Sequence, residues 1–235
     1  MPTLLMTRPE ESAARFAARL GSVPIVISPL IGISFVEDAP EVRDGEHYVL
    51  TSAHAVEAIQ ALGLPKRPAW CVGAATALEA EAAGLTARSA DGDADGLVSA
   101  ILEAGEAAPL LHLHGAHTRG DVATRLSAAG VTTRGAVAYL QPEQAFSEAA
   151  QALLGCVVAP VFSPRTARIF AENWRGKARL YLVALSEAVA EPLRQMVAEE
   201  ICVSARPDAV AMLEATEAAW VRASRLEAGQ GAAID

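Results

Sequence analysis

The sequence predicts an α/β fold of two similar units, each built around a mainly parallel β-sheet. Short runs rich in β-branched residues alternate with alanine-rich stretches in which leucine, valine and isoleucine recur at three- and four-residue spacing. Motifs of one half of the chain recur in the other half, and 235 residues are enough for two domains of ordinary size. We therefore expect two α/β domains.

Eight apolar runs bounded by turn residues are predicted strands, and the segments between them are predicted helices. These strands are 3–6, 25–27, 48–51, 69–72, 110–113, 156–161, 180–183 and 201–203. Segments 31–36 and 131–139 also have strand composition, but proline-containing segments follow them, so we expect connectors there. Residues 223–235 are small and polar and are expected to fray.

A serine opens a predicted helix in each half of the chain. Ser52 and Ser163 both follow a predicted strand, and 111 positions separate them. The same separation relates Thr7-Arg8 to Thr118-Arg119, and a Gly-x-x-Thr motif of the first half has a degraded match in the second. The sequence therefore predicts two diverged copies of one α/β unit.

Charge and composition argue against several classes of protein. A net charge of -9 disfavours nucleic acid or an anionic membrane as the main partner, because both bind concentrated basic surfaces. No apolar run reaches the roughly 18 residues of a membrane span, and the N-terminus lacks the pattern of a secretory leader. Three widely spaced cysteines in apolar surroundings indicate buried thiols, so we expect a cytoplasmic protein.

The partial metal motifs of the sequence are incomplete. Segment 91–96 opens like a calcium loop, but a leucine stands where the bidentate glutamate belongs, so a helix-capping loop is expected. His112, His114 and His117 have no thiol nearby, and we expect them to be hydrogen-bonded or to face a cleft. The sequence also lacks a nucleotide-binding glycine motif and a nucleophile elbow. We expect no metal and no cofactor.

A set of short motifs in a fixed order resembles the uroporphyrinogen-III synthase family. The motifs are Thr7-Arg8-Pro9, Thr51-Ser52, the Val-Gly-x-x-Thr-Ala segment 72–77, Gly115 followed by Arg119, Tyr139, and Ser163-Pro164. Their order, their spacing and the 111-residue duplication carry the resemblance, since none of them is specific alone. His54-Ala55 stands where the family usually has Asn-Gly.

The resemblance implies two flavodoxin-like parallel-sheet domains joined by a two-stranded hinge, with a cleft between them. The first domain would be discontinuous, comprising residues 1–33 and 143–235, and the second would span 40–135. Residues 34–39 and 136–142 would be the connectors, in agreement with the strand-like segments described above. Such a hinge would let the cleft open and close.

The resemblance also implies an activity, the cyclisation of hydroxymethylbilane to uroporphyrinogen III with loss of water and inversion of ring D. This lyase reaction of haem biosynthesis needs no cofactor, because the protein's main task is to hold a flexible substrate in one conformation. We expect a monomer that binds this small molecule and could receive it from the preceding enzyme of the pathway. The alternative is a catalytically inactive small-molecule binding or regulatory module of the same fold.

The resemblance places the family's connector tyrosine at Tyr139, the expected catalytic residue. A neutral tyrosine hydroxyl can donate a hydrogen bond to the departing hydroxyl; the alternative is that the ring only packs over the connector. Substrate carboxylates are expected at strand-to-helix turns, where helix N-termini bind anions even in an acidic protein. A serine there can also be a helix cap, and the two roles are compatible. The expected substrate-binding residues are Arg8, Thr51, Ser52, Gly73, Thr76, Gly115, Arg119, Ser163 and Arg165.

Overall fold

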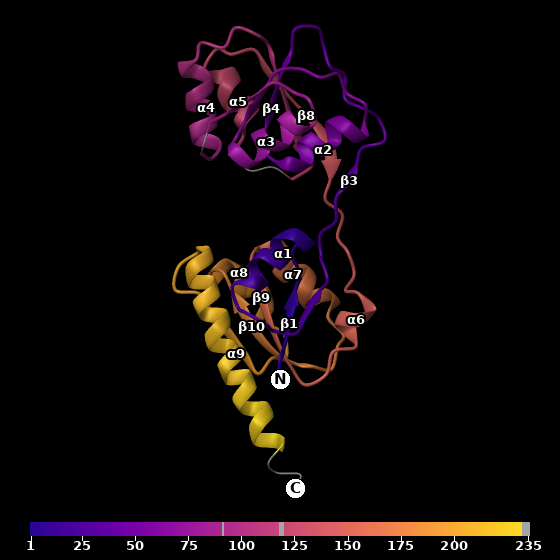
Figure 1. The fold of residues 1–235 in the computed structure, drawn as a ribbon, viewed down its shortest axis with the longest axis vertical. Coiled ribbons are helices and arrows are strands. Elements are labelled where there is room, and N and C mark those ends of the chain that lie inside the picture. The colour runs from indigo at the N-terminus through magenta and orange to yellow at the C-terminus, as the bar shows by residue number, and fades with distance from the viewer. Residues whose placement is uncertain (91, 118–119, 232–235) are drawn as a thin grey trace. The chain divides into compact units, whose positions relative to one another are not determined.

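The computed structural model describes residues 1–90, 92–117 and 120–231 and divides the chain into two compact units (Figure 1). The first unit comprises Met1–Gly32 and Glu143–Asp235, and the second comprises Ile33–Pro142. The two ends of the chain thus belong to one unit and its middle forms the other. Among the described residues, no helix combines the length and the apolar character that crossing a membrane requires.

The first unit has a five-stranded, fully parallel sheet in the order β11-β10-β9-β1-β2. Its strands are β1 (Thr3–Met6), β2 (Ile25–Ile27), β9 (Cys156–Val161), β10 (Arg179–Ala184) and β11 (Glu200–Val203). Numbered along the chain, this is the 2-1-3-4-5 arrangement of a flavodoxin-like sheet. The central strand β9 is buried along its whole length, as expected for a parallel sheet with helices on both faces.

The alternation of side chains along these strands divides the core of the first unit into two layers. Helices α6 (Glu148–Gln151), α7 (Pro164–Asn173) and α8 (Glu187–Leu193) contribute to the layer that contains Leu5. Helices α1 (Glu10–Ala18) and α9 (Ala209–Gly231) contribute to the layer that contains Leu4 and Met6. Burial on both faces explains why these strands read as continuous apolar runs in the sequence.

The second unit has a six-stranded sheet in the order β3-β8-β7-β4-β5-β6, in which β3 alone runs antiparallel to its neighbour. Its strands are β3 (Ser34–Phe35), β4 (His47–Leu50), β5 (Ala69–Cys71), β6 (Ala87–Ser89), β7 (Leu110–Gly115) and β8 (Thr133–Leu140). One face packs on α2 (Ala53–Ala61) and α3 (Ala74–Ala82). The other face packs on α4 (Ala94–Glu103) and α5 (Val122–Ala128).

The two sheets have the same spatial order of strands. The order β2-β1-β9-β10-β11 of the first unit matches the order β8-β7-β4-β5-β6 of the second. The backbone at the helix caps also matches: Ser52 (φ -157°, ψ 146°) resembles Ser163 (φ -147°, ψ 148°), and Gly73 (φ -159°, ψ 170°) resembles Ser186 (φ -160°, ψ 170°). The predicted internal repeat is confirmed, and the N-terminal segment completes the second copy.

One part of the proposed repeat is wrong as a structural equivalence. Leu4 lies opposite Val158 in the first sheet, whereas Leu110 lies opposite His47 in the second. Val158 and His47 are counterparts at the repeat separation of 111, so Leu4 corresponds to Leu110. Positions 6, 7 and 8 therefore correspond to 112, 113 and 114, and not to the Thr118-Arg119 pair, which lies outside the described residues.

Two strand assignments also differ from the sequence prediction. Most of segment 131–139, expected as a connector, forms β8 of the second sheet, and β3 pairs with the end of this strand. Pro142 follows β8 without preventing it, because the proline lies outside the hydrogen-bonded ladder. The edge strand β6 is not predicted, since its sequence Ala-Arg-Ser has no β-branched or aromatic residue.

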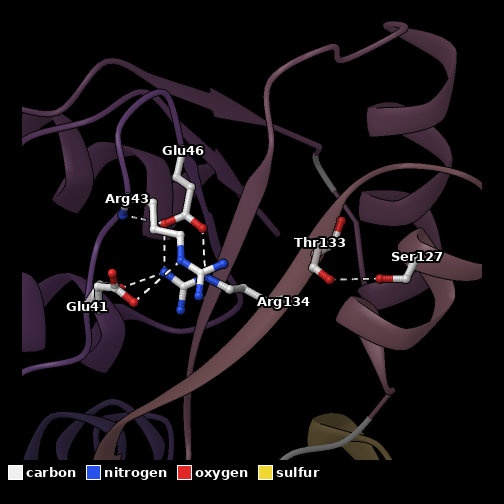
Figure 2. A network of polar contacts seen from close by, with 6 residues as sticks. All are labelled: Glu41, Arg43, Glu46, Ser127, Thr133 and Arg134. Carbon is white, nitrogen blue, oxygen red and sulfur yellow. Dashed lines mark hydrogen bonds and ion pairs between the residues drawn. The ribbon is translucent and has the colours of Figure 1, made fainter.

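A polar network closes the amino end of the second sheet (Figure 2). Glu46 is 3% exposed and accepts two hydrogen bonds of 2.7 Å from the Arg134 guanidinium of β8. The backbone N–H of Arg43 donates a third, also at 2.7 Å, and Arg134 donates to the carbonyl of Glu41 at 2.6 Å. Burial alone would raise the pKa of Glu46, but these donors and cations outweigh burial and hold its pKa below the ordinary value.

Candidate functional site

A pocket of about 340 Å³ lies within the second unit at the carboxyl ends of its strands. The neighbouring strands β4 and β7 contribute to it at the point where the strand order reverses, which is where open α/β sheets bind ligands. None of the described residues that line the pocket is Asp, Glu, Lys or Arg. The lining residues are Thr51, Ser52, Val72, Ala94, His114, Gly115, His117, Tyr139 and Gln141. Four of the predicted site residues thus lie in one pocket.

Tyr139 lies near the carboxyl end of β8 and is 5% exposed. Its ring meets the ring of His54 edge-on, with the centroids 5.7 Å apart. Gly115 makes room for it, because a Cβ at that position would lie 2.5 Å from Tyr139 Cε2 and 2.9 Å from Gln141 Oε1. The sequence requires glycine at 115 for this close approach, and the approach fixes the tyrosine ring against the pocket wall.

The strand-to-helix turn after β4 provides two hydroxyl groups. Ser52 is the N-cap of α2, and its Oγ accepts a hydrogen bond of 3.2 Å from the backbone N–H of His54. The cap uses only a lone pair of the Ser52 oxygen, so the O–H of Ser52 can still donate to a ligand. Thr51 Oγ1 lies 3.2 Å from Nε2 of His112. Capping and ligand binding are therefore compatible at this turn.

The three clustered histidines have different surroundings. His112 is buried, and burial, with a smaller contribution from the neighbouring His114, lowers its pKa to about 4. His114 lines the pocket, and its Nδ1 donates to the carbonyl of Gly115 at 2.9 Å, since a carbonyl can only accept. His117 also lines the pocket. The expectation of hydrogen-bonded or cleft-facing histidines is confirmed, and no group of three potential metal ligands occurs among the described residues.

Three other predicted site residues belong to the second unit: two of them do not line this pocket, and the third lies outside the described residues. Gly73 is the N-cap of α3, and Thr76 lies in the first turn of the same helix with a buried side chain. Arg119 lies outside the described residues. The calcium-like segment acts as a helix cap, as expected: Asp93 caps α4 by accepting from the N–H groups of Asp95 and Gly96, while residue 91 lies outside the described residues.

The remaining predicted residues lie at the carboxyl edge of the first sheet. The guanidinium of Arg8 lies over the ring of Phe162, 4.4 Å from its centroid, and partial burial and the charge of Arg15 lower the pKa of Arg8. Ser163 caps α7 through a bond of 3.1 Å from the N–H of Thr166. Arg165 lies in the first turn of α7 and lines an open pocket of about 580 Å³ within this unit.

A larger pocket of about 930 Å³ lies elsewhere in the first unit, beside the amino ends of β10 and β11. It contains none of the predicted residues and does not lie at the strand ends where α/β sheets bind ligands. We therefore assign the site by position and chemistry rather than by volume. Gln141 and Ala94 line the pocket and were not predicted from the sequence; the Gln141 side chain accepts a hydrogen bond from the backbone N–H of His117 at 3.2 Å.

Comparison with known proteins identifies the family of the chain. A family model described as uroporphyrinogen-III synthase HemD matches residues 11–214. The uroporphyrinogen-III synthetase of Helicobacter pylori 26695 is 14% identical, with a TM-score of 0.63 over 91% of this chain and 97% of that chain. A mutant uroporphyrinogen III synthase of the extremely thermophilic bacterium Thermus thermophilus is 15% identical, with a TM-score of 0.46 over 94% of this chain and 100% of that chain. The first likeness shows the shared α/β fold, and the family match spans most of the sequence. The chain belongs to the uroporphyrinogen-III synthase family, and its activity is the cyclisation step of tetrapyrrole biosynthesis.

Proposed function

We propose that the pocket of the second unit binds the reacting end of hydroxymethylbilane, with Tyr139 as the hydrogen-bond donor to its hydroxyl group. The observation that carries the proposal is that Tyr139 shares one pocket with Thr51, Ser52 and Gly115. The hydroxyl leaves as water when the Tyr139 phenol donates its proton to it, and ring D attacks the delocalised azafulvenium cation that remains; the proton released on closing the macrocycle restores the phenol. The pocket wall then favours attack through the substituted carbon, which leads to inversion of the ring.

Substrate carboxylates are proposed to bind at the helix starts. The N-terminus of α2 offers a favourable dipole, and the hydroxyls of Ser52 and Thr51 provide donors beside it. Neutral donors of this kind suit an anionic ligand in a protein whose net charge is -9. Gly73 and Thr76 at the start of α3, together with Arg8, Arg119, Ser163 and Arg165, remain proposed carboxylate ligands.

The same proposal covers the state of the protein in the cell. The pocket is formed by one unit of one chain, so a monomer is sufficient for it. The described cysteines form no disulfide, and burial raises the pKa of Cys71 to about 11, as suits inert thiols in the reducing cytoplasm. Delivery of the substrate by the preceding enzyme of the pathway would protect a reactive bilane from spontaneous closure.

The test is Tyr139→Phe, which keeps the ring and removes the hydroxyl. Fresh hydroxymethylbilane is supplied, and the type III and type I product isomers are separated, because only type III requires inversion. We expect kcat for type III to fall at least ~10-fold with an unchanged melting temperature. Normal turnover with a lower melting temperature would show that Tyr139 only packs. A wild-type protein that yields only type I would favour the inactive binding module.

A further inference from the structure

A buried imidazole lies behind the wall of the pocket. His112 is the third residue of β7, is 4% exposed and is not among the residues that line the pocket. Its Nε2 lies 3.2 Å from Oγ1 of Thr51, which does line the pocket. Across the part of the chain that the structure describes, this is the one hydrogen bond of the His112 ring. The buried ring is thus connected by hydrogen bonding to the ligand-facing surface.

The face of β7 that carries His112 continues from the apolar core at Leu110 to the pocket at His114, whose ring centroid lies 4.9 Å from that of His112. Leu110, on the same face of the strand, packs in an apolar cluster with Val49 and Leu97. The corresponding position in the first unit is Met6, which is fully buried. An apolar residue would therefore fit this position, and burying an imidazole there costs free energy that one hydrogen bond offsets only in part. Packing alone does not account for a histidine at position 112.

The number of protons shared by Thr51 and His112 determines which of the two donates the hydrogen bond between them. Thr51 has one hydroxyl proton, and neutral His112 has one N–H, because its pKa of about 4 keeps it uncharged near pH 7. If Thr51 donates to His112, its oxygen presents only lone pairs to the pocket, and these repel a carboxylate. If His112 donates from Nε2, the hydroxyl proton of Thr51 is free to point at the ligand. A bound carboxylate, which can only accept, selects the second arrangement.

We propose that His112 is a positioning residue, which donates from Nε2 to Thr51 so that the Thr51 hydroxyl donates to a carboxylate of the tetrapyrrole substrate. The inference rests on the proposed binding of carboxylates in this pocket. It fits the composition of the pocket wall, where none of the described lining residues is Lys or Arg and an oriented neutral donor is correspondingly important. The effect acts on binding, since Thr51 meets the carboxylate equally in the ground and transition states.

The test compares His112→Leu, Thr51→Val and the double variant, with His112→Gln and Thr51→Ser as conservative partners. We expect each of the first two to raise KM about 10-fold and to leave kcat within about twofold, the signature of lost uniform binding. The double variant should show the same KM as either single variant, because both changes remove one coupled interaction. His112→Gln retains an N–H donor and Thr51→Ser retains the hydroxyl, so both should restore most of the affinity.

The outcomes separate this inference from the proposal on which it rests. If Thr51→Val leaves KM unchanged while wild type makes type III product, the pocket does not bind a carboxylate through Thr51. The proposed carboxylate binding by Thr51 and the positioning role of His112 would then both be wrong. If Thr51→Val raises KM but His112→Leu does not, only the role of His112 falls. A double variant whose KM effect is the product of the two single effects, or a His112→Gln variant no better than His112→Leu, would also overturn it.

Discussion

The carboxyl edges of the two sheets carry equivalent positions with different chemistry. In the second unit, the residue after β4 is Thr51, which pairs with His112 of the neighbouring strand. In the first unit, the residue after β9 is Phe162, whose ring packs edge-on against Phe16 with centroids 5.2 Å apart. The position equivalent to His112 is Met6. A polar pair in one copy thus stands where the other copy has two apolar side chains.

The difference shows how one duplicated scaffold carries two different sets of side chains. In the second unit, neutral donors and the Tyr139 hydroxyl surround the point where the strand order reverses, between β4 and β7. At the equivalent point of the first unit, between β9 and β1, the Arg8 guanidinium lies over the ring of Phe162. Strand order, cap geometry and helix coverage are shared, so the differences lie in a few side chains at the ends of strands. Substitutions of those side chains, or of the groups that hold their strands in place, test whether the two edges differ in function as they differ in chemistry.

The largest expected effect concerns the scaffold of the second unit. Glu46→Ala removes the carboxylate that accepts two hydrogen bonds from Arg134, whose side chain is 29% exposed, and the loss of these charge-assisted bonds should cost on the order of 3 kcal/mol. Urea unfolding should show this loss. Glu41→Ala is the matched control, because that side chain is exposed and Arg134 contacts only its backbone carbonyl. Equal stability of the two variants would contradict the prediction.

The contribution of Glu46 to the free energy of unfolding is expected to depend on pH. The folded pKa of Glu46 lies below its unfolded value, so its contribution to stability is complete above the unfolded pKa of about 4.3 and disappears as the pH falls through the lower folded pKa. The difference in unfolding free energy between wild type and Glu46→Gln should therefore shrink on acidification and be unchanged from pH 6 to pH 8. A difference that grows towards acid would have the wrong sign.

The next effect concerns the approach of Tyr139 to β7. Gly115→Ala would place a Cβ 2.5 Å from the Tyr139 ring, so the ring must move. Because small displacements at a reacting centre are costly, we expect kcat/KM for type III product to fall about 100-fold. Gly73→Ala is the control: nothing lies within 4 Å of its added Cβ, its φ of -159° is ordinary extended backbone, and its N–H remains. Similar losses in both variants would argue against a steric cause.

Most of the fold could be predicted from the sequence, because parallel strands buried on both faces leave uninterrupted apolar runs. Strands 3–6, 25–27 and 156–161 were predicted with their observed bounds. The failures are at the sheet margins, where burial is partial: β6 has no β-branched residue, and alternating exposure and a following proline made β8 resemble a connector. Propensity and periodicity carry little information about such strands.

The site could be predicted only where a residue has a local role. Ser52 and Gly73 mark strand-to-helix turns by their position in the sequence, and the family resemblance singled out Gly115 and Tyr139. The contact of Thr51 with His112 depends on the register of β4 with β7, two strands that three helices and two other strands separate along the chain, and local sequence does not contain that register. Gln141 was missed for the same reason, since it reaches the pocket from the residues after β8.

A smaller effect is expected from the arginine of the first unit. Arg8→Met keeps an apolar side chain over Phe162 and removes the charge. If Arg8 binds a substrate carboxylate, the loss of one charge-assisted hydrogen bond should raise KM about 10-fold at low salt with kcat unchanged. Arg15→Met serves as the control, because Arg15 is a nearby exposed cation on α1. An equal rise in both variants would reveal a general field effect instead of a contact.

The smallest effect, a dependence on salt, distinguishes the two edges most directly. Carboxylates held by a cation are screened by salt, whereas those held by neutral hydroxyls and backbone N–H groups respond less. Raising the ionic strength from about 0.05 M to about 0.5 M should therefore increase the KM of wild type on the order of 3-fold, although the net charge of -9 alone would favour tighter binding of an anion at high salt. Arg8→Met should flatten this response, while Thr51→Val, which removes a neutral donor of the second unit, should keep the wild-type slope at a higher KM. If Thr51→Val flattened the response and Arg8→Met did not, the division into a charged and a neutral edge would be reversed.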